Sequence, residues 1–406
     1  MCQAVHSVLV ALVFVCFVGS SAASSDVAFP QPRSSRFLFA ANATAGGAWP
    51  SLPFSDVVQA VPVSGYPQAI TALTRDGQLW MLDPFAEDLS PVQINDSLGL
   101  NSTALETAVL GRPAEGGSLG SNGGLLAAAS QDGYWICSVA GLALKSTMAC
   151  TSMQFDFGAP VSSVQQTDEP GELYIGTLGN GLFDATAAEP TPSRIAEVTS
   201  SHVISLAYLA SASSTRLAVG TRVKVFVWDS TLGWTWEWVA VPTGLVDGIV
   251  DAVPTAMAYL GSKESLWIGN VRCLNVQHAD MTYRQVAAAQ GLPYGNATAV
   301  ATSGDQVWIG TSDGVIRFDG AAESGTPRRP WSLYRGNRWL PTGAVRSLAG
   351  VSCQNTSCSS MALVVSDTGL AVLSVAPMTL AEKAAHWQGL VRDSGAEAPK
   401  KVLTST

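Results

Sequence analysis

Residues 297–319 read ATAVATSGDQVWIGTSDGVIRFD, and this stretch decides the fold. A strand of alternating small apolar residues comes first, and a second strand, Val307–Thr311, follows it. The turn Ser312-Asp313-Gly314 then leads into a third strand, because Asp-Gly pairs favour tight turns with a positive φ. The stretch therefore predicts consecutive antiparallel strands.

The same pattern recurs along the chain, which is typical of a repeat architecture. Clear copies carry LWIG at residues 266–269 and LYIG at residues 173–176, and weaker copies fill the stretches between them. Aligned on the aromatic position or its equivalent, the seven copies centre on residues 80, 135, 174, 218, 267, 308 and 363. The six steps average about 47 residues, near the roughly 40 to 50 residues of a four-stranded blade. The sequence therefore predicts an all-β fold, a β-propeller with seven blades of four antiparallel strands.

Two features of the repeat have roles that follow from the sequence. The Trp-Ile positions, such as Trp308, are expected to pack between neighbouring blades, and the glycine after them permits a close approach or a bend. Aspartates recur at equivalent turns, at Asp76, Asp132, Asp313 and Asp367. These carboxylates either cap hairpin turns, which we favour, or form a ring that holds a divalent ion on the axis.

The units WIGTSDGVIRFD and YIGTLGNGLFD resemble the two-component regulator propeller repeat, whose core is a Trp-Ile-Gly-Thr strand, a Gly-Leu turn and a short third strand ending near Asp. The segment YRGNRWLP at residues 334–341 resembles that family's connector between blades. The resemblance covers about residues 57–375 and implies the propeller fold and a role in recognition. The sensor role of such propellers in bacterial histidine kinases does not transfer, because we find no kinase or receiver segment in this sequence.

The ends of the sequence lie outside the repeats. Val8–Val18 is almost wholly apolar and small residues follow it, so residues 1–23 are interpreted as a secretory signal peptide. The alternative is an uncleaved membrane anchor, because no Lys or Arg precedes the apolar run. No later stretch is long and apolar enough to span a bilayer, so we expect a secreted, extracellular protein with no membrane span in its mature chain.

The other boundaries follow from composition. Residues 24–56 are rich in Ser, Ala and Pro and are expected to form an irregular leader before the propeller at residues 57–378. Val57–Val61 is expected to be a first strand that closes the ring against the last blade. Residues 379–406 are expected to form a short C-terminal helix, capped by Thr379, and a polar tail.

Sequons and cysteines agree with export. Acceptor sequons for N-linked glycans occur at Asn42, Asn95, Asn101, Asn296 and Asn355. Five cysteines remain after the signal, and their spacing predicts the disulfides Cys137–Cys150 and Cys353–Cys358, with Cys273 left as a thiol. None of them has the spacing of a metal site.

Charge and motifs limit the classes of function. The net charge is −9 and no Lys/Arg cluster occurs, so we expect no nucleic-acid partner. Neither a metal-binding histidine pattern nor a nucleophile elbow is found, so the sequence predicts no catalytic residues, no metal and no cofactor.

The leading hypothesis is a recognition scaffold that binds a carbohydrate or an extracellular protein through loops at one end of the ring. Arg335, Arg338 and Trp339 are the candidate ligand-binding residues, since two cations beside an aromatic plane suit an acidic sugar or a carboxylate. Alternatively, Trp339 packs between blades and the arginines are merely solvated. The rival function is a propeller enzyme, such as a lactonase, lyase or glycosidase, with carboxylates around a central pocket.

Trp234, Trp236 and Trp238 alternate with polar residues, so their side chains share one face of a strand. We favour a role in filling the wedge between two blades. The alternative is a stacking platform for sugar rings.

Overall fold

The computed structural model describes the following residues of the chain: 30–37, 56–64, 66–83, 91–94, 105–114, 124–139, 148–189, 191–211, 214–222, 224–235, 254–270, 273–280, 282–286, 296–319, 331–334, 344–351, 360–367 and 369–377. Ser34–Val375 form one compact unit, and Met1–Arg33 with Ala376–Thr406 form a second. Of the second unit only residues 30–33 and 376–377 are described, as strand. These residues are the ends of two strands that continue into the first unit, and the other elements described below belong to the first unit.

The described strands form six sheets, in which strands that follow one another along the chain pair antiparallel. Four of these sheets are simple four-stranded meanders, and each is named here by its place in the chain. Meander 1 contains β2 (Val57–Val63), β3 (Tyr66–Thr74), β4 (Leu79–Leu82) and β5 (Val92–Gln93). Meander 4 contains β14 (Val203–Ala210), β15 (Thr215–Thr221), β16 (Val225–Asp229) and β17 (Gly233–Thr235). Meander 5 contains β18 (Ala256–Leu260), β19 (Ser265–Gly269), β20 (Leu274–Gln277) and β21 (Tyr283–Val286), with the 3-10 turn η1 (Gly261–Lys263) between its first two strands. Meander 6 contains β22 (Ala297–Ser303), β23 (Gln306–Thr311), β24 (Gly314–Asp319) and β25 (Trp331–Tyr334).

An eight-stranded sheet joins two further meanders. Meander 2 contains β6 (Val109–Arg112), β7 (Gly124–Ser130), β8 (Gly133–Val139) and β9 (Met148–Gln154). Meander 3 contains β10 (Val161–Gln166), β11 (Glu172–Thr177), β12 (Leu182–Thr186) and β13 (Ser193–Arg194). Their first strands, β6 and β10, pair parallel, with Val164 opposite Gly111 and Gln165 opposite Arg112.

Meander 7 consists of β26 (Val345–Val351), β27 (Ser360–Ser366) and β28 (Gly369–Pro377), with β1 (Pro30–Phe37) as its outer strand. The strand that completes this sheet therefore lies inside the segment expected to be irregular. Val57–Val61, expected to be a first strand that packs against the last blade, lies in β2, the first strand of meander 1, which contacts β26 and β27 of the last meander. β1 contains two prolines and two serines, which are not typical of a strand, so its sequence does not indicate one. An edge strand tolerates proline because only one of its sides is paired.

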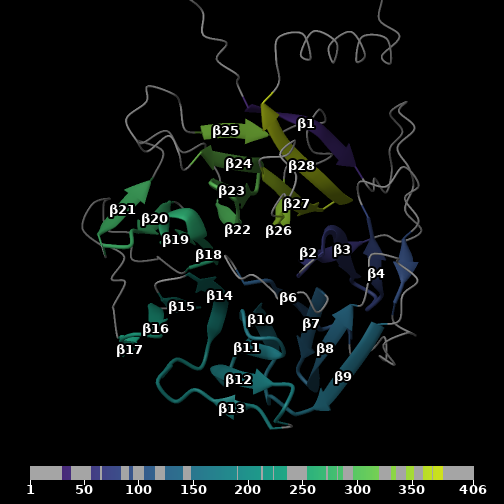
Figure 1. Ribbon diagram of the computed structural model, residues 1–406, viewed down its shortest axis with the longest axis vertical. Helices are drawn as coiled ribbons and strands as arrows, with labels where there is room; N and C mark the ends of the chain where they lie inside the picture. The colour runs from purple at the N-terminus through teal and green to yellow at the C-terminus, as the bar shows by residue number, and fades with distance from the viewer. Residues whose placement is uncertain are drawn as a thin grey trace, which may run out of the picture. The chain divides into compact units, whose positions relative to one another are not determined.

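The first strands of the meanders contact one another in a closed order. The contacting pairs are β2 with β6, β6 with β10, β10 with β14, β14 with β18, β18 with β22, β22 with β26, and β26 with β2. Figure 1 shows the first strands toward the middle of this unit and later strands, such as β13, β17 and β21, toward its outside. The hydrophobic core is correspondingly divided into clusters that lie between successive meanders.

Glycine and tryptophan on the second strands make these contacts close. Trp308 is fully buried in a cluster with Val345, Leu348 and Ala362 of meander 7. The next glycine in that strand, Gly310, has no room for a side chain, because a Cβ there would lie 2.6 Å from Val345 Cγ1. Glycines in the same place in three other meanders also face the next first strand: Gly176 faces Val203, Gly220 faces Met257, and Gly269 faces Val300. The packing role expected of the Trp-Ile-Gly positions is confirmed.

Bulges at the start of the first strands add a polar link. The pairing with the second strand shifts by one residue at Ser162 in β10 and at Thr298 in β22, so neither residue has a partner in that register. The Ser162 hydroxyl donates to the carbonyl of Val203 at 2.6 Å, and that of Thr298 to Val345 at 2.7 Å. Because a bulge re-aims the side chain of the extra residue, these hydroxyls reach the backbone of the next meander.

Two of the weaker repeat copies were aligned on the wrong strand. Trp80 lies in β4 and Trp135 in β8, which are third strands, whereas Tyr174, Trp267 and Trp308 lie in second strands. A strand with an aromatic residue can either precede or follow an Asp-Gly turn, and the sequence motif does not distinguish the two cases. The repeat was therefore found, but its register in meanders 1 and 2 was not.

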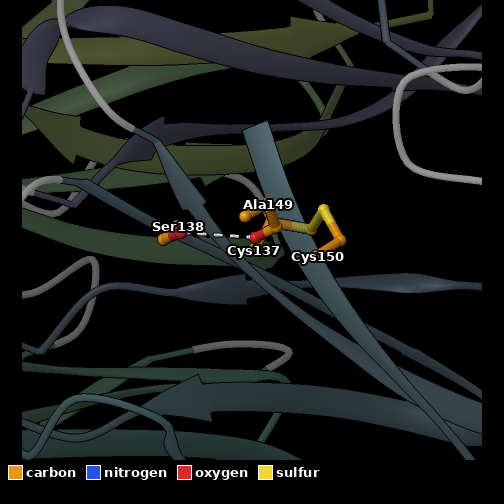
Figure 2. The surroundings of a disulfide bond; sticks show 4 residues. All are labelled: Cys137, Ser138, Ala149 and Cys150. Carbon is orange, nitrogen blue, oxygen red and sulfur yellow. Dashed lines mark hydrogen bonds between the residues drawn. A yellow bond between two sulfur atoms is a disulfide. The ribbon is translucent and has the colours of Figure 1, made fainter. Parts of the chain in front are cut away.

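The Cys137–Cys150 disulfide is confirmed and links the neighbouring strands β8 and β9 (Figure 2), where the two residues are Cα partners. Cys273 keeps its thiol, whose sulfur lies 3.8 Å from Asn270 Nδ2. Cys353 and Cys358 lie outside the described residues, as do the signal segment at 1–23 and the C-terminal helix at 379–391. Within the described part of the chain, no helix is long and apolar enough to cross a membrane.

The first prediction concerns the close contact at Gly310. We expect Gly310→Ala to lower the free energy of unfolding by about 1–3 kcal/mol, because the added methyl group overpacks against Val345. Urea or thermal unfolding measures the loss. The double variant Gly310→Ala/Val345→Ala is the control, and it should lose less than the sum of the two single variants. Strict additivity would contradict the contact.

The second prediction concerns the cysteines. Peptide mapping without reduction is expected to recover a Cys137–Cys150 peptide, while Cys273 is alkylated without a reductant. Replacing both bridged residues with alanine should cost about 3 kcal/mol by the chain-entropy model, since the loop is short. Recovery of Cys273 in a disulfide with either residue would contradict the pairing.

Candidate functional site

In six meanders the second strand ends on a small buried polar residue, and in meander 5 such a residue, Asn270, directly follows the strand. These residues are Thr74, Ser130, Thr177, Thr221, Asn270, Thr311 and Ser366. Most of their hydroxyls hydrogen-bond within the following turn; Thr311 Oγ1, for example, donates to the Gly314 carbonyl at 2.9 Å, and the amide of Asp313 donates back to it. Since all first strands also begin at this end of the sheets, we call it the turn end. The buried hydroxyls fix the turns and leave the residues at their tips exposed.

The recurring aspartates lie at these exposed tips. Asp76, Asp132, Asp313 and Asp367 all fall in the turn between the second and third strands of their meanders. Asp76 accepts a short hydrogen bond from the Thr74 hydroxyl within its own turn. Among the described residues, no three His, Cys, Asp or Glu side chains gather closely enough to hold a metal ion. The turn interpretation of these aspartates accounts for their places.

An exposed ion-pair network links meanders 7 and 1 at the turn end. Arg346 Nε lies 2.6 Å from Asp367 Oδ1, and its Nη1 lies 3.7 Å from Asp56 Oδ1. Asp56, which precedes β2, also pairs with Arg75 at 3.1 Å. Arg346 is the residue skipped by the bulge in β26, the position that Thr298 occupies in β22. A charged pair thus takes the place of the hydroxyl link at this junction.

The predicted ligand-binding residues lie outside the described residues. Arg335, Arg338 and Trp339 fall in the connection between β25 and β26. Of the five sequons, only the one at Asn296 can be placed; Asn296 is exposed and immediately precedes β22, at the turn end. Asn42, Asn95, Asn101 and Asn355 are outside the described part, and glycosylation remains a prediction at every site.

One tryptophan of the predicted stripe can be placed. Trp234 in β17 is half-buried and packs against the cluster of meanders 3 and 4, beside its partner Trp228 in β16. This contact agrees with the favoured role of filling the space between meanders. Trp236 and Trp238 lie outside the described residues.

A cluster of carboxylates and tyrosines lies at the opposite end of meanders 3 and 4, which the sequence did not indicate. Tyr208 donates a 2.5 Å hydrogen bond to Asp168, and Thr167 donates one of 2.9 Å to Glu172. The rings of Tyr174 and Tyr208 lie 6.3 Å apart. Asp184 is the Cα partner of Tyr174, and its buried Oδ1 has no hydrogen-bond partner. We call Asp168, Glu172, Tyr174, Asp184 and Tyr208 the carboxylate–tyrosine cluster.

Burial controls the protonation of this cluster. It raises the pKa of Glu172, and neighbouring Asp184 and Asp168 raise it further. Burial is also the main cause of the raised pKa of Asp184, and it raises the pKa of both tyrosines. No arginine or lysine is among these causes, so the raised pKa values favour proton retention on the carboxyls of Glu172 and Asp184 and on the two phenols.

No protein-family model matches the chain, and no curated protein matches its sequence. The resemblance to the two-component regulator propeller repeat therefore rests on the motifs themselves.

The third prediction uses the carboxylate–tyrosine cluster. Because the pKa of Glu172 is raised in the folded state, its contribution to stability is present below its ordinary value of 4.5 and is lost as pH rises through the folded pKa. We therefore expect Glu172→Gln to gain stability relative to the parent protein as pH rises from about 4 to neutrality. Thermal unfolding across this range measures the difference.

Glu197→Gln is the matched control, because Glu197 is exposed in the connection between β13 and β14. Its stability relative to the parent should change little over the same range. A difference for Glu172→Gln that does not vary with pH would contradict the raised pKa.

Proposed function

We propose that this chain is a secreted seven-bladed β-propeller that acts as a recognition scaffold. The ligand is a carbohydrate or an extracellular protein, held by loops at one end of the ring. Each meander supplies one blade, and β1 supplies the outer strand of the last blade.

The closed order of contacts between first strands is the observation that carries the propeller proposal. Seven groups of four strands are described, and β26 of the last group contacts β2 of the first. Clusters between successive meanders, such as the one around Trp308, bury both faces of the sheets. A propeller accounts for this pattern, because packing blades around one axis covers their faces and leaves only short edges exposed.

The recognition role follows from where accessible polar groups remain. Most side chains on the strands are committed to packing, whereas Arg75, Asp76 and Asp367 in the turns, and Arg346 at the bulge of β26, are exposed at the turn end. The connection with Arg335 and Trp339 joins the last strand of one meander to the first strand of the next, and first strands begin at this end. The turn end is therefore the favoured binding end.

The disulfide supports an export route, because disulfides persist mainly in oxidising compartments. Together with the apolar segment Val8–Val18 and the sequons, it favours a secreted protein with a cleaved signal. N-terminal sequencing of the secreted product tests this part: we expect cleavage near Ala23, and an intact Met1 in a membrane fraction would support the anchor instead.

An enzyme is the second candidate, and the carboxylate–tyrosine cluster is the observation that favours it. A carboxyl with a raised pKa, such as Glu172, is suited to general acid catalysis near neutral pH. The cluster lies at the end of the sheets opposite the turn end, however, and the charged side chain that reaches in among the first strands is that of Arg112 rather than a carboxylate. The scaffold therefore remains the favoured function.

The fourth prediction tests recognition directly. The purified secreted chain is screened against a glycan array and a panel of extracellular proteins, and we expect a saturable ligand. Arg335→Ala/Arg338→Ala should weaken that ligand about tenfold or more, since charge-assisted hydrogen bonds would be lost.

Asp132→Asn, a change at one exposed turn tip of meander 2, is the control and should bind normally. Circular dichroism verifies that each variant is folded. Unchanged affinity in the arginine variant would remove its loop from the site, and hydrolysis of a ligand that Glu172→Gln abolishes would favour the enzyme.

A further inference from the structure

Arg112 extends from the end of β6 across to two distant first strands. Its Nη1 donates hydrogen bonds to the carbonyl of Met257 in β18, at 3.5 Å, and to that of Val300 in β22, at 3.4 Å. The first strands next to β6 are β2 and β10, whereas β18 and β22 belong to meanders 5 and 6. The guanidinium therefore lies among the first strands and joins β6 to β18 and β22, neither of which is next to β6.

This cation has little to balance its charge. Both of its hydrogen bonds come from a single nitrogen and are near the upper limit of length, although a guanidinium has five donors. No ion pair joins Arg112 to a carboxylate in the described part of the chain. Burial lowers the pKa of Arg112, and no acid among the described residues opposes this shift. A buried charge is costly unless an opposite charge accompanies it.

Other arginines of the chain show what is missing. Arg216 lies 2.9 Å from Asp229, and Arg346 lies 2.6 Å from Asp367. Each of these two guanidinium groups has a carboxylate partner. Arg112 has no carboxylate partner among the described residues. The buried Arg317 has none either, and its Nη2 donates to Ser332 Oγ at 3.3 Å; Arg112 is the one that reaches the backbone of two distant first strands.

The base of Arg112 is held firmly, and solvent can still reach the side chain. Gln165 Nε2 donates to the carbonyls of Arg112 and Pro113, each at 3.1 Å, which fixes the end of β6 against β10. Arg112 nevertheless has intermediate solvent exposure, although protein surrounds its guanidinium. Part of the residue is thus accessible to water.

We propose that Arg112 anchors a binding site for a small oxyanion among the first strands. A carboxylate, such as that of a uronic acid, or a phosphate would accept hydrogen bonds from the guanidinium nitrogens that the carbonyls leave unused. The site rests on the proposed recognition function and deepens it, because it assigns the ligand an acidic group. The alternative is that Arg112 only braces the first strands.

The fifth prediction measures binding of three probes to the full secreted chain. Thermal unfolding and calorimetry are followed with glucuronate, with inorganic phosphate and with neutral glucose, all at an ionic strength held constant with sodium chloride. We expect a saturable rise in Tm with glucuronate or phosphate and none with glucose, since a ligand that binds only the folded state stabilises it. Comparison of glucuronate with phosphate shows which oxyanion the site takes.

Variants separate anion binding from bracing. Arg112→Met should bind the effective anion about 30-fold more weakly, as expected when a charged partner is lost, whereas Arg112→Lys should keep part of the affinity. Arg216→Met removes a cation and an ion pair elsewhere, so it controls for lost charge and lost stability; its anion-dependent rise in Tm should match that of the parent protein.

The proposal is overturned if the parent protein shows no saturable rise with either anion, a result that needs no variant to fold. It is also overturned if Arg112→Met keeps the full rise. A ligand from the recognition screen whose affinity is the same in Arg112→Met would leave the recognition function standing without this site. If an anion raises the Tm but the recognition screen returns no ligand, the Arg112 site would be supported and the proposed binding by loops would not.

Discussion

The contact between the second strand of one meander and the first strand of the next is the constraint on which the rest of the structure depends. It requires a glycine at Gly176, Gly220, Gly269 and Gly310, where a Cβ would lie 2.5–3.0 Å from the next first strand. The hydroxyls of Ser162 and Thr298 lie beside this contact and bond to the same next strand. Apolar burial supplies the driving force, while the missing side chain and the polar link determine how closely the sheets approach.

This packing also determines where function can lie. A strand whose two faces are buried between meanders has no side chain to offer a ligand, so binding must use the turns, the connections or the space among the first strands. The buried Thr, Ser and Asn residues at the ends of the second strands hold the turns in place, and the charges of Arg75 and Arg346 lie exposed beside them. Arg112 extends in among the first strands without a carboxylate partner in the described part of the chain.

The sequence predicted the strands wherever a motif combined an aromatic residue, a glycine and an Asp-Gly turn, as around Trp308. The sequence did not show whether an aromatic residue precedes or follows the Asp-Gly turn of its repeat, and Trp80 and Trp135 proved to lie on third strands. It also missed β1, whose prolines suit an edge strand but are not typical of strands. Arg112 and the carboxylate–tyrosine cluster could not be predicted, because contacts between residues as distant as Arg112 and Val300 arise only when the meanders pack together. One available signal was overlooked: a Thr or Ser ends the second strand in six of the seven meanders.

The central claim is that seven meanders close into one ring, and a crystal structure of the protein tests it most directly. The account predicts seven four-stranded blades around a single axis, with β26 beside β2, Gly310 against Val345, and Arg112 reaching the carbonyls of Met257 and Val300. An open arrangement in which β26 and β2 are apart, or a different number of blades, would contradict it.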